Sequence, residues 1–117
     1  MRFFRFQRVS SLIREKLSWI IEREVEVPGA LITITEVDVT KKLDYAKVRV
    51  SVFPSEKAGD AIRELGRRAG ELQHILNRTL NIKPMPRISF DLDRGPENAA
   101  IVEKILLKDE EGSNALG

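Results

Sequence analysis

The chain has 117 residues, of which 42% are hydrophobic and 32% are charged, a size and composition typical of one globular domain. The absence of cysteine excludes disulfides, thiolate zinc sites and cysteine nucleophiles. No apolar run approaches the roughly 18 residues that a membrane-spanning helix needs, and the basic, aromatic first residues lack the features of a signal peptide. We therefore expect a cytoplasmic protein that does not associate with membranes.

The positive charge is unevenly distributed along the chain, although the net charge is only +2. Segments 1–16 and 67–87 each carry a local charge of +4, which leaves −6 for the rest of the sequence. Concentrated positive charge on an otherwise acidic body is typical of a protein that binds a polyanion such as RNA. The alternative is a mixed, solvated surface that has no partner.

An amphipathic helix is predicted from about residue 6 to residue 25, because its apolar residues recur at steps of three and four. This apolar face consists of Val9, Leu12, Ile13, Leu17, Ile20 and Ile21. Residues 31–39 and 45–53 are rich in β-branched residues and predict two strands. The connection 40–44 has the length of a hairpin loop, so we expect the strands to pair antiparallel.

A longer helical pattern covers residues 56–80 and is interrupted by Gly66 and Gly70. Each glycine costs about 0.5–1 kcal/mol relative to alanine inside a helix, which predicts a kink or two helices at an angle. A third strand is predicted at 87–92 and a last short helix at 97–107. The helices between the second and third strands form a crossover, so the third strand should run parallel to a neighbour.

The predicted fold is therefore α+β, with a three-stranded mixed sheet packed by helices. The order of elements is α-β-β-α-kink-α-β followed by a C-terminal helix, and it matches that of the bacterial-type KH domain. We expect a single KH-like domain over residues 1–108 and a flexible acidic tail over residues 109–117.

Several blocks, in the same order and with similar spacings, resemble ribosome-binding factor A over about residues 6–107. The blocks are Gln7-Arg8-Val9, Arg23-Glu24-Val25, Pro28, Leu43, Tyr45-Ala46-Lys47-Val48, Val50-Ser51, Gly70, Leu72, Ile75-Leu76, Pro86, Ile88, Phe90 and Asp93. The chain departs from the family pattern in a shorter connection after Pro28, in Arg68 where the kink usually has alanine, and in Lys42 before Leu43.

The resemblance implies a ribosome assembly factor that is not an enzyme and needs no cofactor. Members of this family bind immature small ribosomal subunits, contact small-subunit ribosomal RNA and assist late maturation and rRNA processing, particularly in the cold. The expected partners are thus the small ribosomal subunit and its RNA, bound by a monomer.

The segment Gly66-Arg67-Arg68-Ala69-Gly70 stands where an ordinary KH domain has its GxxG loop, but it is one residue too long. In one interpretation the glycines let the backbone approach phosphate while the two arginines supply charge and forked donors. In the other, which suits the glycines better, Gly66 and Gly70 are structural kink residues required for packing.

The basic N-terminal segment is a second candidate surface, because phenylalanines alternate with its arginines and aromatic rings can stack on bases. The simpler explanation is that these phenylalanines belong to the start of the helix. The hairpin connection and the turn before the third strand supply further cations. The complete predicted RNA-binding set is Arg2, Arg5, Arg8, Arg14, Lys16, Lys41, Lys42, Arg67, Arg68, Arg78, Lys83 and Arg87.

The sequence contains no catalytic constellation or metal site. His74 is the only histidine and lies beside apolar helix positions, while Asp91 and Asp93 have no further metal-ligating residues near them in the sequence. Trp19 is expected to pack rather than to bind a ligand. Two alternatives remain open, namely a KH-like protein that binds another RNA and a protein–protein adaptor that uses the kinked helix.

Overall fold

The structure of the chain is a computed structural model, and it describes residues 5–95. Its elements are α1 (Arg5–Glu24), β1 (Leu31–Val39), β2 (Tyr45–Phe53), the 3-10 turn η2 (Ser55–Lys57), α2 (Ala58–Arg67), α3 (Ala69–Thr79) and β3 (Arg87–Leu92). All three strands agree with their predicted bounds, and the long helical segment is two helices, as the glycines indicated. The predicted helix 97–107 and tail 109–117 lie outside the described residues.

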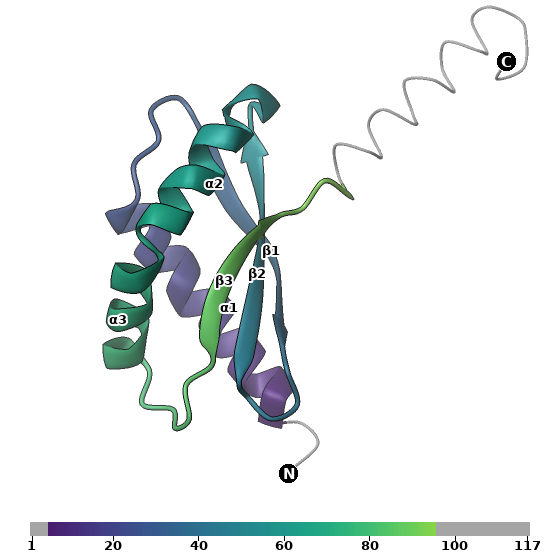
Figure 1. Cartoon of the computed structure of the whole chain (residues 1–117), viewed down its shortest axis with the longest axis vertical. Helices are drawn as coiled ribbons and strands as arrows, with labels where there is room; N and C mark the ends of the chain where they lie inside the picture. The colour runs from purple at the N-terminus through teal and green to yellow at the C-terminus, as the bar shows by residue number, and fades with distance from the viewer. Residues whose placement is uncertain (1–4, 96–117) are drawn as a thin grey trace, which may run out of the picture.

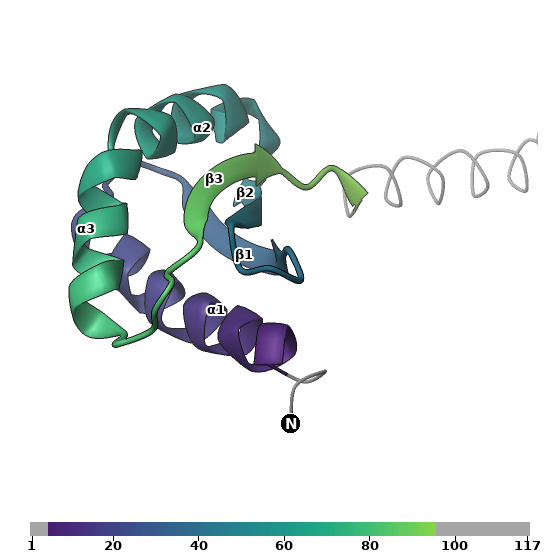
Figure 2. The same ribbon diagram turned by 60° about the horizontal axis from the view of Figure 1, so that its bottom comes forward.

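The three strands form one mixed sheet in the order β1-β2-β3. The pair β1 and β2 is antiparallel, whereas β3 runs parallel to β2, which confirms the predicted α+β fold with a mixed sheet. The helices α1, α2 and α3 all lie against one face of this sheet (Figure 1). Figure 2 shows them curving around that face and leaving the opposite face uncovered by the described elements.

The core lies between the helices and the covered face of the sheet. Residues Ala46, Val48 and Val50 alternate along β2 and are fully buried, because successive side chains of a strand point to opposite faces. The apolar face of α1 packs against them as predicted, except that Leu12 is 38% exposed and lies at its edge. The hydroxyl of Ser10 donates a hydrogen bond to the carbonyl of Val37 at 2.5 Å and so fixes α1 on β1.

The hairpin between β1 and β2 is held by a leucine in a left-handed backbone conformation. Leu43 has φ of 62°, which costs roughly 1–2 kcal/mol for a residue with a Cβ atom. Its side chain is nevertheless buried in the core, so the burial of this side chain offsets the backbone strain. Thr40 accepts backbone hydrogen bonds from Asp44 and Tyr45 at 3.0 and 3.2 Å. The turn therefore has a fixed shape, and Lys41 and Lys42 are exposed at its tip.

Candidate RNA interface

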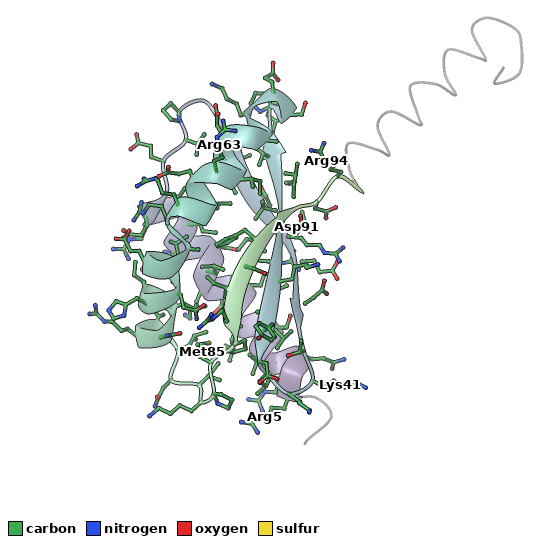
Figure 3. The ribbon with its side chains drawn as sticks, viewed as in Figure 1. Arg5, Lys41, Arg63, Met85, Asp91 and Arg94 are labelled. Carbon is green, nitrogen blue, oxygen red and sulfur yellow. The ribbon has the colours of Figure 1, made fainter. Side chains whose placement is uncertain are left out.

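One end of the molecule carries six cationic side chains that four separate segments supply. These segments are the first two turns of α1, the β1–β2 hairpin, the α3–β3 connection and the first residue of β3. The six exposed residues, which we call the basic end, are Arg5, Arg8, Lys41, Lys42, Lys83 and Arg87. Figure 3 shows Arg5 and Lys41 at this end, where the start of α1 lies near the hairpin.

Hydrogen bonds between these segments hold the basic end together. The guanidinium of Arg5 donates to the carbonyl oxygen of Lys83 at 3.4 Å, which joins α1 to the connection before β3. The backbone N–H of Arg87 donates to the carbonyl of Asp44 at 2.9 Å and joins β3 to the hairpin. The cations thus come from segments far apart in the sequence and are brought together by the parallel placement of β3 beside β2.

The six cations of the basic end have few acidic neighbours in the described part of the chain. Within residues 5–95 none of them forms an ion pair with a carboxylate, and Asp44 is the one acidic residue of the hairpin connection 40–44. Cations that lack acidic partners produce a positive potential that attracts polyanions and steers their approach. The basic end therefore has the electrostatic character of a phosphate-binding surface.

An open hollow of about 520 Å³ lies beside the basic end, between α1 and the α3–β3 connection. Arg5, Arg8 and Lys83 line it together with the apolar side chains of Leu12 and Ile82. Guanidinium groups at the rim of a partly apolar surface suit a ligand that carries both phosphates and bases.

The other predicted RNA-binding residues do not join this cluster. Arg14 is exposed farther along α1, Lys16 lies 3.5 Å from the carboxylate of its neighbour Glu15, and Arg78 is exposed on α3. Arg2 lies outside the described residues. Of the eleven predicted cations within residues 5–95, the structure therefore groups six and places five apart from them.

Both arginines at the kink interact with acidic residues of the protein itself. Arg67 binds Glu64 through two hydrogen bonds of 3.0 and 2.6 Å, and this pairing lowers the pKa of Glu64 and raises the pKa of Arg67. The side chain of Arg68 is only 17% exposed and lies 2.6 Å from Glu71 and 3.6 Å from Glu24. Their charge is thus largely compensated, in contrast to that of the basic end.

The bend between α2 and α3 occurs at Arg68, whose φ and ψ are −94° and 3°. Gly66 and Gly70 lie inside the two helices on either side of the bend, and neither has a positive φ. A Cβ atom built on either glycine meets nothing within 4 Å. The bend is therefore where the sequence predicted it, but the packing reason proposed for the two glycines finds no counterpart in the structure.

Sequence reasoning missed two features of the helical layer. Trp19 was expected to pack, yet its side chain is 55% exposed and the guanidinium of Arg23 lies over its ring at 4.4 Å. Gln73 of α3 binds the backbone before and within β3, accepting from the N–H of Ile88 at 2.8 Å and donating to the carbonyl of Pro86 at 3.1 Å. The i, i+4 spacing of Trp19 and Arg23 is a signal that was available in the sequence.

Residues 5–95 contain neither a membrane-spanning helix nor a cluster of metal ligands. None of the helices there combines the length and apolar character needed to cross a membrane. The same stretch has no group of three or more His, Cys, Asp or Glu residues arranged to hold a metal ion.

Comparison with known proteins identifies the family. The family model described as "Ribosome-binding factor A" matches residues 5–106, which is most of the chain. The chain belongs to the ribosome-binding factor A family. A ribosome-binding factor A from Acetivibrio thermocellus is 38% identical over 105 residues, which cover 87% of this chain and 85% of the relative.

Solved structures of the ribosome-binding factor A family share the fold. The crystal structure of ribosome-binding factor A from Thermus thermophilus superimposes with a TM-score of 0.66 at 25% identity, covering 77% of this chain and 97% of that one. A homology model of the Thermus thermophilus factor, fitted into a cryo-EM map of a 30S complex with that factor, gives a TM-score of 0.61 at 27% identity. It covers 72% of this chain and 90% of that one.

Proposed function

We propose that this protein is a ribosome assembly factor that binds the immature small ribosomal subunit and its ribosomal RNA through the basic end. It acts in the cytoplasm as a monomer, without catalysing a reaction and without a cofactor, and assists late maturation and rRNA processing, including at low temperature. The observation that carries the proposal is that the Thermus thermophilus factor was fitted into a 30S complex. This chain shares its fold and its family with that factor.

The chemistry of the basic end supports phosphate recognition. Three of its six cations are arginines, whose planar guanidinium groups bind phosphate oxygens through two parallel hydrogen bonds. Contacts to phosphate fix the position of a protein on RNA without reading its sequence. The basic end would thus recognise the backbone shape of a folded RNA, and its binding energy would favour the RNA conformation that fits it.

Co-sedimentation with purified ribosomal subunits tests this proposal. The wild type and the double variant Arg5→Glu, Arg8→Glu are mixed with immature small, mature small and large subunits over a salt series. We expect salt-sensitive binding of the wild type to small subunits and at least a tenfold loss in the double variant, because each like charge repels the RNA phosphates. Thermal unfolding followed by circular dichroism verifies that the variant is folded.

Arg63→Glu is the control, because Arg63 is also exposed but pairs with Asp60 on α2, at the opposite end of the molecule (Figure 3). It should bind like the wild type. Failure of the wild type to bind small subunits at low salt would refute the proposal, and equal affinity for unrelated free RNA would favour a general RNA-binding protein. Binding that resists both salt and ribonuclease would favour a protein–protein adaptor.

A further inference from the structure

A second hollow, of about 310 Å³, lies between α1 and α3 at a distance from the basic end. Trp19, Arg23 and Arg78 stand at its rim, and Ile20 and Ile75 contribute apolar surface. Trp19 is the only tryptophan of the chain, and more than half of its side chain is exposed. We call this hollow the tryptophan groove.

The tryptophan groove is positively charged. Within residues 5–95 neither Arg23 nor Arg78 forms an ion pair. The one acidic residue that lines the groove is Glu24, and its carboxylate is occupied by Arg68 at 3.6 Å. The groove therefore combines an exposed aromatic ring with two arginines that have no acidic partner in the described part of the chain.

The tryptophan groove and the hollow at the basic end open along the same side of α1. At 3.6 residues per turn, Arg8 and Trp19 differ in direction by only about 20°, and they are separated by roughly 16 Å along the helix axis. Each hollow has α1 as one wall, and the other wall is α3 or the connection that follows it. A strand of RNA bound at Arg8 can thus follow α1 to Trp19.

We propose that the tryptophan groove binds an unpaired nucleobase of RNA, stacked on the indole of Trp19, with Arg23 and Arg78 on the adjoining phosphates. The inference rests on the proposed function, since it assumes that RNA already occupies the basic end. Stacking is tolerant of base identity, because every base has a π-face. The guanidinium that now covers the ring has room to move to a phosphate, since Arg23 is exposed.

The fluorescence of Trp19 reports directly on the tryptophan groove, because no other tryptophan contributes. The wild type is titrated with a single-stranded decauridine, with an RNA duplex of the same length, and with inorganic polyphosphate. Decauridine should quench the emission, whereas the duplex and the polyphosphate should leave it nearly unchanged. Equal quenching by polyphosphate would overturn the inference, because charge alone would then explain the signal.

Substitutions show which residues bind the RNA, and the measured quantity is the affinity of each variant for fluorescein-labelled decauridine. We expect Trp19→Leu to weaken binding at least fivefold, which corresponds to the lower end of the stacking energy measured per base, about 1 kcal/mol. Arg23→Gln should weaken it by a similar factor. Arg63→Gln is the matched control, because Arg63 is exposed on α2 and lines neither the tryptophan groove nor the hollow at the basic end. Unchanged affinity of Trp19→Leu would overturn the inference, and a contact with a protein partner would then be the better explanation of the exposed ring.

The outcomes separate this inference from the proposed function. If the wild type sediments with small subunits but decauridine leaves Trp19 unquenched, the tryptophan groove is not a base site and the proposed function stands. If decauridine quenches Trp19 but small subunits are not bound, the groove binds RNA and the proposed function fails.

Discussion

Arg68 at the helix kink is bonded to Glu24 at the end of α1, 44 residues away in the sequence. One guanidinium nitrogen donates to the backbone carbonyl of Glu24, and another lies 3.6 Å from its carboxylate. The carbonyls of the last turn of a helix lack partners within the helix, so this contact satisfies one of them. Arg68 therefore connects the bend between α2 and α3 to the C-terminal end of α1.

Replacing Arg68 with glutamine should lower the free energy of unfolding by about 1–3 kcal/mol, because a charge-assisted hydrogen bond is lost and Glu24 and Glu71 lose their partner. Arg67→Gln is the neighbouring control and should change stability little, since its pair with Glu64 is exposed to solvent. Urea unfolding of both variants measures the difference. Equal losses would show that Arg68 has no special structural role.

Gln73 should stabilise the attachment of α3 to β3 through both ends of its amide. Gln73→Leu leaves the N–H of Ile88 and the carbonyl of Pro86 without their partner, which costs about 1–3 kcal/mol for buried groups. Gln73→Glu keeps an acceptor for Ile88 but removes the donor to Pro86, so its loss should be smaller. Urea unfolding ranks the variants, and a glutamate variant no more stable than the leucine variant would contradict the assignment.

The sheet and the helix break could be predicted because their signals are local. The alternation of Ala46, Val48 and Val50 with polar residues is present in the sequence itself, as are the glycines on both sides of Arg68. An exposed tryptophan on an amphipathic helix is harder to predict. Trp19 does not belong to the predicted apolar face, and the sequence does not show that it stands exposed at a hollow between α1 and α3.

The basic end could be predicted only as a list of cations, because the sequence does not show which of them meet. The parallel pairing of β3 with β2 joins Arg87 to the hairpin, and the connection before β3 brings Lys83 to Arg5. Conversely, Arg68 counts as positive charge in the sequence but is engaged by two glutamates in the structure. Counting charges along the chain predicts that a basic surface exists, but it does not predict which residues form that surface.

Gly66→Ala should raise the free energy of unfolding by about 0.5–1 kcal/mol, because alanine restricts the unfolded backbone and favours the helix. A Cβ atom at this position has no neighbour within 4 Å, so no clash opposes the gain. The same variant tests whether RNA approaches the bare backbone here. A stabilised variant with unchanged RNA affinity would exclude that contact, and a destabilised variant would show that the glycine is needed for the bend.

Removing one phosphate contact should change the salt dependence of RNA binding as well as the affinity. For Arg8→Gln we expect the slope of log affinity against log salt concentration to become less steep by about 0.7–0.9, the value for one neutralised phosphate. Fluorescence anisotropy with a labelled small-subunit RNA fragment measures the slope, and Arg63→Gln is the control. A weaker affinity with an unchanged slope would mean that Arg8 does not contact phosphate.

The carboxylate of Asp93 should make the protein less stable as the pH falls. The Thr35 hydroxyl donates to one carboxylate oxygen at 2.6 Å and the Gly95 N–H donates to the other at 2.9 Å, and these bonds lower the pKa of Asp93 below its usual value of 3.8. The carboxyl group of Asp93 therefore binds a proton more tightly in the unfolded chain than in the folded chain. The stabilisation is complete above the usual pKa and is lost as the pH falls through it toward the lower folded value.

Thr35→Val removes the main donor and should return the pKa of Asp93 toward its usual value, so that unfolding depends less steeply on pH in the acid range. The pKa of Glu36, next to Thr35, is raised rather than lowered, because its side chain interacts with Asp38. That pair is present in both proteins, so the difference between wild type and variant reports mainly on Asp93. An NMR titration of the carboxyl carbon measures the pKa directly. A wild-type pKa at or above the usual value would show that the Thr35 hydroxyl does not stabilise the ionised form.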